Sequence, residues 1–217
     1  MSSFTGHERF EDRADAGREL ARVLSRREFD DPVVLGLPRG GVPVAVPVAR
    51  VLHAPLDVLI VRKVGAPGHA EVAMAAVGED GTAVRNPSVI AAVGADEQTV
   101  SHAEERERAE VERRSRMLRA GEDAVPLGGR TAIIVDDGIA TGASMSAACE
   151  IARERGAASI IVAVPVAPPD VVAELGASAD EIVALTTPPD FMAVGMHYFD
   201  FRQTSDEEVV RLLAGTR

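Results

Sequence analysis

At residues 132–144 the chain reads Ala132-Ile133-Ile134-Val135-Asp136-Asp137-Gly138-Ile139-Ala140-Thr141-Gly142-Ala143-Ser144. The four apolar residues predict a buried strand, and the two carboxylates stand at its carboxyl end. A loop of small residues follows, and the apolar spacing after it predicts a helix from Met145 to Arg155. A strand, a glycine-rich loop and a helix in this order are typical of an α/β protein that binds a phosphate group.

The loop has the residues that an anion-binding turn requires. Gly138 and Gly142 permit positive φ and a close approach of the backbone to a ligand. Backbone N–H groups can converge on an anion, helped by the positive end of the following helix. The hydroxyl groups of Thr141 and Ser144 add further donors. We therefore expect a phosphate group to bind Gly138, Ile139, Ala140, Thr141, Gly142, Ala143 and Ser144.

The acid pair suits a different part of a ligand. When ionised, Asp136 and Asp137 are hydrogen-bond acceptors, and together they can bind the two hydroxyl groups of a ribose. The alternative is an ordinary strand-to-helix turn that carries two acids by chance. Such a turn requires neither the acid pair nor so many hydroxyl and glycine residues in one short loop.

The stretch 132–144 resembles, without a mismatch, the signature of the type I phosphoribosyltransferases for 5-phosphoribosyl 1-diphosphate (PRPP). That signature has four hydrophobic residues, two acids, Gly, any residue, Ala, Thr, Gly, any residue and Ser. The resemblance implies that the loop binds the 5-phosphate and that Asp136 and Asp137 bind the ribose. It also implies a Mg²⁺ ion, which Asp136 and Asp137 would hold through ribose hydroxyls or water.

A second loop, residues 37–43, directly follows the predicted strand Val33–Leu37. A cation followed by two glycines before a helix can present a guanidinium and backbone N–H groups to a diphosphate. The loop resembles the diphosphate loop of the same family, in which the peptide after the first loop residue is often cis. The resemblance assigns Arg39, Gly40 and Gly41 to the diphosphate. The alternative is a plain glycine-rich turn.

A third candidate is the pair Arg62-Lys63, at the end of the predicted strand Leu56–Arg62. Lys63 is the only lysine of the chain. Several members of the family have an Arg-Lys pair here, followed by a lid, so the resemblance directs Lys63 and Arg62 to the diphosphate leaving group. His69 is a candidate for proton transfer by its position. The alternative is a surface loop with a solvated lysine and an exposed histidine.

The tail is rich in aromatic side chains. Aromatic residues make up 3% of the chain, yet four of them lie within residues 191–201. Such rings can stack on a planar base, and Phe191 with Val194-Gly195 resembles the base-stacking segment of the purine salvage enzymes, which makes Phe191 a candidate for base stacking. Alternatively, the rings anchor the C-terminal segment to the core. Ser205 and Glu208 form a capping box and predict a closing helix to about Leu213.

The order of the predicted elements indicates one α/β domain. The resemblance implies a parallel sheet flanked by helices, with a small hood. We expect a core at residues 12–85 and 128–187, a helical insertion at 88–121 and the hood at 188–217. Within the insertion, residues 96–119 predict a charged, largely solvated helix whose role is open.

Composition limits the classes of function. Lys and Arg number 23 against 34 Asp and Glu, a formal net charge of -11, so no nucleic-acid partner is expected. A single cysteine, Cys149, excludes an intramolecular disulfide and a zinc site made of several thiolates. The polar start, residues 1–13, lacks the apolar segment of a secretion signal, and no apolar run is long enough to cross a membrane. A cytoplasmic location is expected.

The resemblance implies a Mg²⁺-dependent phosphoribosyltransferase of nucleotide metabolism. It would move ribose 5-phosphate from PRPP to a nitrogenous base, with Lys63, Arg39 and Asp137 as catalytic residues. The acceptor base is not readable from the sequence. Two alternatives keep the same fold: a regulatory protein that binds PRPP or a nucleotide, and a hydrolase of a phosphoribosyl compound. Dimers are common among similar proteins, so a homodimer is expected.

Overall fold

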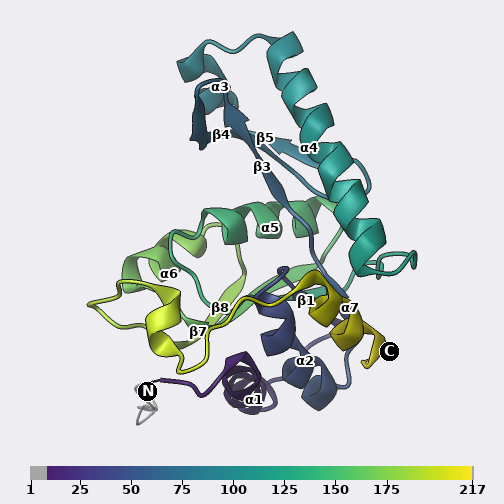
Figure 1. The fold of residues 1–217 in the computed structure, drawn as a ribbon. Coiled ribbons are helices and arrows are strands. Elements are labelled where there is room, and N and C mark those ends of the chain that lie inside the picture. Colours follow the sequence, from purple (N-terminus) through teal and green to yellow (C-terminus); the bar gives the residue numbers. More distant parts are fainter. Residues whose placement is uncertain (1–8, 217) are drawn as a thin grey trace.

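The computed structural model describes residues 9–216, apart from the side chains of residues 70 and 71, and its centre is a five-stranded parallel sheet (Figure 1). In spatial order the strands are β2 (Leu56–Val58), β1 (Pro32–Gly36), β6 (Thr131–Val135), β7 (Ser159–Val166) and β8 (Glu181–Thr186). Each strand is parallel to its neighbours. The fold is therefore the α/β class expected from the sequence. Residues 1–8, part of the polar start, lie outside the described residues.

The apolar run before the acid pair is buried on both faces of this sheet. Ala132 and Ile134 face one apolar cluster, while Ile133 and Val135 face the other. Successive side chains of a strand point to opposite faces, so a continuous apolar run is what a strand between two helical layers requires. The layers are visible in Figure 1, with α5 and α6 on one side and α1 and α2 on the other.

The helices of the two layers are α1 (Arg13–Leu24), α2 (Gly41–Leu52) and α7 (Asp206–Ala214) on one face, and α5 (Ala143–Glu154) and α6 (Pro169–Leu175) on the other. Helix α2 begins at Gly41 and contains Pro47. A Cβ at Gly17 would lie 2.4 Å from the carbonyl oxygen of Val44, so the backbones of α1 and α2 are in direct contact.

A smaller unit projects from one end of this core. It consists of the antiparallel strands β3 (Arg62–Ala66), β4 (His69–Val77) and β5 (Ala83–Arg85), with helices α3 (Pro87–Val93) and α4 (Glu97–Leu118) (Figure 1). The prediction of one strand over Leu56–Arg62 was wrong in length. The strand β2 ends at Val58, the N–H of Leu59 donates once more to Gly36, and Arg62 starts a different sheet.

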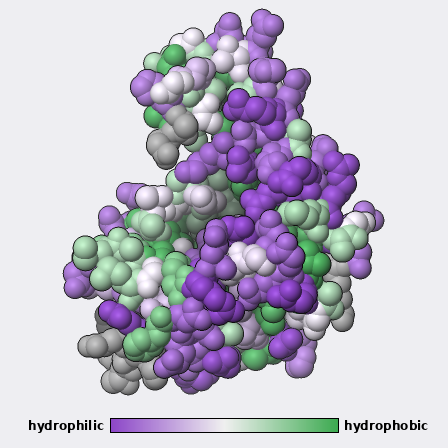
Figure 2. Space-filling model, viewed as in Figure 1, coloured by the Kyte–Doolittle hydropathy of each residue, from purple (hydrophilic) through white to green (hydrophobic). Residues whose placement is uncertain are grey.

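The long helix α4 is hydrophilic on its outer side, as predicted from its charge pattern (Figure 2). Its buried positions are Val100, Val111 and Leu118, together with one acid, Glu104. The side chain of Asp96 caps its first turn by accepting from the N–H of Thr99. The helix is thus attached to its unit by a narrow apolar stripe and by charged contacts.

The C-terminal segment returns to the beginning of the described chain. After β8 it forms a short 3-10 helix (Val194–His197). Ser205 is then the N-cap of α7, and its side chain accepts from the N–H of Glu208 as the capping box predicts. Phe10 and Tyr198 form a parallel bridge. Among residues 9–216, no helix has both the length and the apolar character needed to cross a bilayer.

Candidate active site

Two of the predicted loops meet at the carboxyl edge of the parallel sheet. They follow β1 and β6, which are neighbours in the sheet, so both loops leave at the same edge. A Cβ at Gly40 would lie 2.0 Å from Oδ2 of Asp137, and one at Gly41 would lie 2.4 Å from the carbonyl oxygen of Val135. Only glycines permit this approach. The predicted diphosphate loop therefore lies directly against the acid pair. The peptide between Pro38 and Arg39 is cis, as the resemblance implied.

The loop after the acid pair leads into an open helix end. Gly142 is the N-cap of α5 with φ of 73°, and no side chain caps this helix. The side chains of Thr141 and Ser144 are exposed. Within residues 9–216, neither hydroxyl forms a hydrogen bond, and the amides of Ala140 and Thr141 donate to no backbone acceptor. These donors are available to a ligand.

One residue of this loop is engaged within the protein. The side chain of Ile139 is buried, and its N–H donates to the carbonyl oxygen of Val166 at 2.9 Å. Gly138 is close to Val166 and Val194, since its Cβ would lie 2.9 and 2.6 Å from their methyl groups. Ile139 therefore anchors the loop to β7, and the donors that face outward come after it.

The two acids have different environments. Asp136 accepts the N–H of Asp137 at 2.9 Å, and burial raises the pKa of its carboxyl well above the usual range, with a further rise from the charge of Asp137. Asp137 accepts from Nε of Arg13 at 2.7 Å. Burial raises the pKa of the Asp137 carboxyl as well, and Arg13 opposes this rise. An acceptor with a fixed positive partner is thus present at the predicted ribose position.

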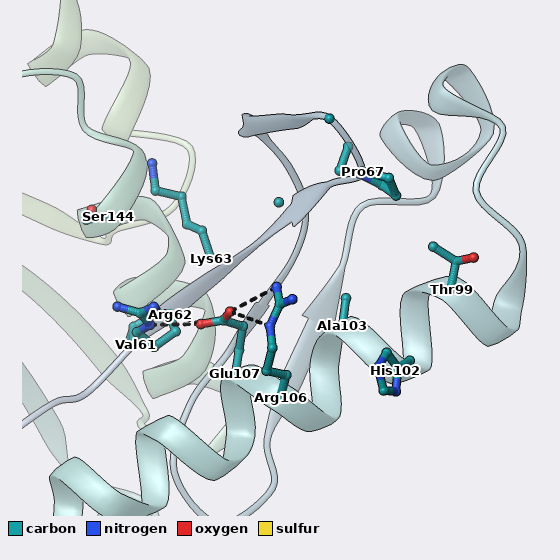
Figure 3. Close-up of a pocket in the computed structure, with 13 residues that line it drawn as sticks. Val61, Arg62, Lys63, Pro67, Thr99, His102, Ala103, Arg106, Glu107 and Ser144 are labelled. Carbon is teal, nitrogen blue, oxygen red and sulfur yellow. Dashed lines mark hydrogen bonds and ion pairs between the residues drawn. The ribbon is translucent and has the colours of Figure 1, made fainter.

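The predicted cations lie in three different places. Nη1 of Arg39 is 3.9 Å from a carboxylate oxygen of Asp206 in α7. Nε of Arg62 donates to Glu107 of α4 at 2.9 Å. Lys63, on the other side of strand β3, reaches toward Ser144 at the start of α5 (Figure 3). Adjacent residues of a strand point to opposite sides, so the side chains of Arg62 and Lys63 extend in different directions, although both line one cavity.

A cavity of about 780 Å³ separates β3, α4 and the start of α5. Lys63 and Ser144 both line it, and Glu107 lies between the guanidinium groups of Arg62 and Arg106 (Figure 3). This cavity connects the projecting unit with the end of the loop at residues 138–144. His69, in contrast, is exposed at the first position of β4.

The aromatic tail forms two groups. Phe191 is half-buried and stacks on His197 with ring centroids 5.7 Å apart. Tyr198 is buried between Phe10 and Phe201, at ring distances of 5.6 and 5.0 Å. The second group anchors the C-terminal segment to the core, which is the alternative that the sequence left open for the aromatic rings. Phe191 remains a candidate for base stacking.

Two residues of the site were missed from the sequence. Arg13 binds Asp137 from α1, and the hydroxyl group of Tyr198 donates to the carbonyl oxygen of Asp137 at 2.6 Å. These residues are 124 and 61 positions away from Asp137 in the chain. No local motif marks Arg13, whereas Tyr198 belongs to the aromatic concentration that the sequence does show.

The acid pair is also the candidate for holding Mg²⁺. Within the described part of the chain, no group of three or more His, Cys, Asp or Glu could hold a metal ion. Mg²⁺ prefers oxygen ligands and is often bound by one or two carboxylates, with waters and substrate oxygens completing its shell. Asp136 and Asp137 fit that role, and no closed protein site for the ion is required.

The comparisons with known proteins agree with this geometry. The family described as phosphoribosyl transferase domain matches residues 7–186. Relatives from two strains of Mycobacterium tuberculosis are each 52% identical over 204 residues, 94% of this chain and 46% of the relative, and carry the provisional name phosphoribosyl transferase. The chain therefore spans about half the length of these relatives. The crystal structure of TT1426 from Thermus thermophilus is 46% identical, with a TM-score of 0.88 over 95% of this chain and 98% of that chain. The chain belongs to the phosphoribosyl transferase domain family.

Proposed function

We propose that the chain is a Mg²⁺-dependent phosphoribosyltransferase that moves ribose 5-phosphate from PRPP to a nitrogenous base and releases diphosphate. The observation that supports this most directly is the contact of Gly40 and Gly41 with the acid pair, beside the uncapped start of α5. This arrangement offers one region for each part of PRPP. The open turn receives the 5-phosphate, the acids receive the ribose, and the loop at Arg39 receives the diphosphate.

Each region has a role in the reaction. Displacement at the anomeric carbon passes through a state with positive charge on the sugar, as in glycoside hydrolysis. The carboxylates of Asp136 and Asp137 orient the ribose and favour that charge. The amides and hydroxyls of residues 140–144 hold the 5-phosphate, and binding energy far from the reacting carbon thereby positions it. Arg39 supplies fixed positive charge for the leaving diphosphate.

When bound, Mg²⁺ supplies positive charge that neutralises diphosphate oxygens. Asp136 and Asp137 would hold it through ribose hydroxyls or water. Phe191 is part of the proposal as a stacking surface for the base. The proposal also includes a homodimer and a cytoplasmic location, since charged sugar phosphates are retained in the cytoplasm.

The proposal is tested by incubating the protein with Mg²⁺, PRPP and a panel of purine and pyrimidine bases. Diphosphate release that requires one base is the expected result, and it identifies the acceptor. Release in the absence of any base contradicts transfer to a base and favours the hydrolase. Calorimetric binding of PRPP without release across the panel favours the regulatory protein.

Asp137→Asn is expected to weaken PRPP binding about 100-fold, because a neutral amide accepts less well from the diol and no longer pairs with Arg13. Calorimetry in Mg²⁺ buffer measures the affinity. Asp15→Asn, which changes an acid in the first turn of α1, is the matched control and should bind PRPP as the wild type does. Unchanged affinity in a folded Asp137→Asn protein contradicts the assignment.

Lys63→Ala is expected to abolish most turnover with a smaller loss of PRPP affinity, because its charge is needed most as the leaving group departs. Stopped assays of diphosphate release, with the base found in the panel, give kcat and KM separately. Arg106→Ala changes a cation on the other wall of the same cavity and serves as the control. Wild-type turnover by Lys63→Ala removes Lys63 from the mechanism.

A further inference from the structure

We infer that Arg13 is a positioning residue for Asp137, and that the C-terminal segment 198–202 holds Arg13 in the geometry that this role requires. The inference rests on the proposed function, since it assigns a task to Asp137 in binding the sugar. It adds a residue from α1 and a function for the aromatic tail.

The carboxylate of Asp137 is confined from two sides. Nε of Arg13 lies 2.7 Å from Oδ2, and the two side chains are only 11% and 15% exposed. Gly40 closes the other side, because a Cβ there would lie 2.0 Å from the same oxygen. The rotation of the carboxylate is therefore limited. Arg13 binds Oδ2, and within residues 9–216 no other residue donates a hydrogen bond to Oδ1, which leaves this oxygen for a ligand hydroxyl.

The backbone of Asp137 is fixed at the same place. Its carbonyl oxygen accepts from the hydroxyl group of Tyr198 at 2.6 Å. The side chain and the backbone of one acid are thus both bound by residues from outside the acid loop. A carboxylate that must meet a ligand hydroxyl benefits from this support, because its orientation is set before the ligand arrives.

Arg13 is itself held by the C-terminal segment. Nη1 donates to the carbonyl oxygen of Arg202 at 2.7 Å, and the guanidinium carbon lies 4.0 Å from the centroid of the Phe201 ring. A guanidinium can bind a carboxylate, a carbonyl oxygen and an aromatic face at once because its donors lie in a rigid plane. A lysine has the charge but cannot repeat this geometry. The tail therefore sets the direction from which Arg13 approaches Asp137.

The competing interpretation is that Arg13 only joins α1 to the tail. In that case its loss lowers stability but leaves the affinity for PRPP unchanged in the folded fraction. A positioning role instead predicts coupling, because the effect of Arg13 on binding passes through Asp137. A double-mutant cycle with Asp137→Asn separates the two interpretations.

The experiment measures PRPP affinity by calorimetry in Mg²⁺ buffer for the wild type, Arg13→Gln, Arg13→Lys, Asp137→Asn and the double variant Arg13→Gln with Asp137→Asn. Arg13→Gln is expected to lose about ten-fold in affinity, and Arg13→Lys to recover part of that loss. The double variant should bind no more weakly than Asp137→Asn alone. Arg18→Gln, on the exposed side of the same helix, is the control and should match the wild type.

Wild-type affinity in folded Arg13→Gln overturns the inference, and so do losses that add in the double variant. If Arg13→Gln does not fold, Arg13→Lys and Phe201→Leu, which removes the ring beside Arg13, still test it through a loss of two-fold or more expected in each. A wild-type protein that does not bind PRPP overturns the proposed function and this inference together. Binding by the wild type with no effect of Arg13 overturns the inference alone.

Discussion

The parallel core and the projecting unit differ in how much apolar burial and how many ion pairs hold them together. In the core, strands β6 and β7 are buried along nearly their whole length by apolar side chains on both faces. The projecting unit buries fewer apolar residues, chiefly Val64, Met74 and Val77 of β3 and β4 together with a narrow apolar stripe on α4. Charged residues also bind α4 to the strands. Apolar burial is non-directional, whereas a buried ion pair is favourable only with accurate geometry. The unit that carries Lys63 thus depends on specific contacts for its place beside the loop at residues 138–144.

The dependence on specific contacts is clearest at Arg119, where the projecting unit meets the parallel core. The side chain of Arg119, just after α4, is 1% exposed, and it donates to Asp57 of β2 at 2.7 Å and to Glu79 of the β4–β5 turn at 2.8 Å. It also donates to the carbonyl oxygen of Val58 at 2.8 Å. The second oxygen of Asp57 accepts from the N–H of Val125 at 2.8 Å. One guanidinium therefore joins the core, the small sheet and the end of α4.

The largest expected effect follows from breaking this junction. Arg119→Met leaves two buried carboxylates, those of Asp57 and Glu79, without their main partner, which is expected to cost about 3–5 kcal/mol of unfolding free energy. Urea unfolding followed by circular dichroism measures it. Arg116→Met, an exposed position of the same helix, is the control and should behave as the wild type. Equal stability of the two variants would mean that the junction does not bear on stability.

The difference in stability between Arg119→Met and the wild type is also expected to depend on pH. Burial raises the pKa of the Glu79 carboxyl, and the guanidinium of Arg119 opposes this rise, so its removal raises that pKa further. A carboxyl whose pKa is higher in the folded than in the unfolded protein binds its proton more tightly when folded. The loss of unfolding free energy in Arg119→Met is therefore largest above the raised pKa of Glu79. This loss becomes smaller as pH falls toward 4.5. A deficit that is constant over this interval contradicts the explanation.

The next effect concerns the contact between the two loops of the core. Gly40→Ala places a methyl group against the Asp137 carboxylate and is expected to weaken PRPP binding about 100-fold, equivalent to about 2.7 kcal/mol. Calorimetry measures the affinity. Gly128→Ala, whose Cβ would meet nothing within 4 Å, is the matched control and should leave binding unchanged. Wild-type affinity of Gly40→Ala would show that the close approach of the loops is not needed.

The smallest effect compares two ion pairs of α4. Arg85→Ala removes the main partner of Glu104, which is 2% exposed, and is expected to cost about 1–2 kcal/mol because Arg108 still contacts this acid. Arg113→Ala removes a pair with Glu110 at the surface and should produce no resolvable change in urea unfolding. Equal losses from the two variants would indicate that burial of Glu104 does not decide the strength of its pair.

The parts that sequence predicts well are those in which local pattern and tertiary environment agree. The apolar run 132–135 that predicts a strand lies within β6 (Thr131–Val135), because a continuous apolar run is a local signal that agrees with burial on both faces. The residues of the strand expected over Leu56–Arg62 mostly favour a strand, yet the chain changes from one sheet to another within this stretch. That change depends on contacts with β4, which no local pattern contains.

Among the ion pairs of α4, local spacing likewise predicts some pairs and fails for others. The spacing of Glu104 and Arg108 predicts their pairing, and the structure has it at 3.3 Å. The same spacing at Glu110 and Arg114 predicts a pair, but Glu110 binds Arg113 instead. Exposed pairs of similar spacing are nearly equal in energy, so local sequence does not select among them.

The amino-acid sequence by itself determined the α/β class, the glycine-rich loop at residues 138–144 and the acid pair, because each depends on patterns of residues that are near one another in the chain. Only the tertiary structure decided that Arg13 and Tyr198 support Asp137, that Arg62 and Lys63 point apart, and that Arg119 joins the two regions. These contacts bring together side chains that are distant in the chain, and their energy depends on geometry and burial that exist only in the folded protein.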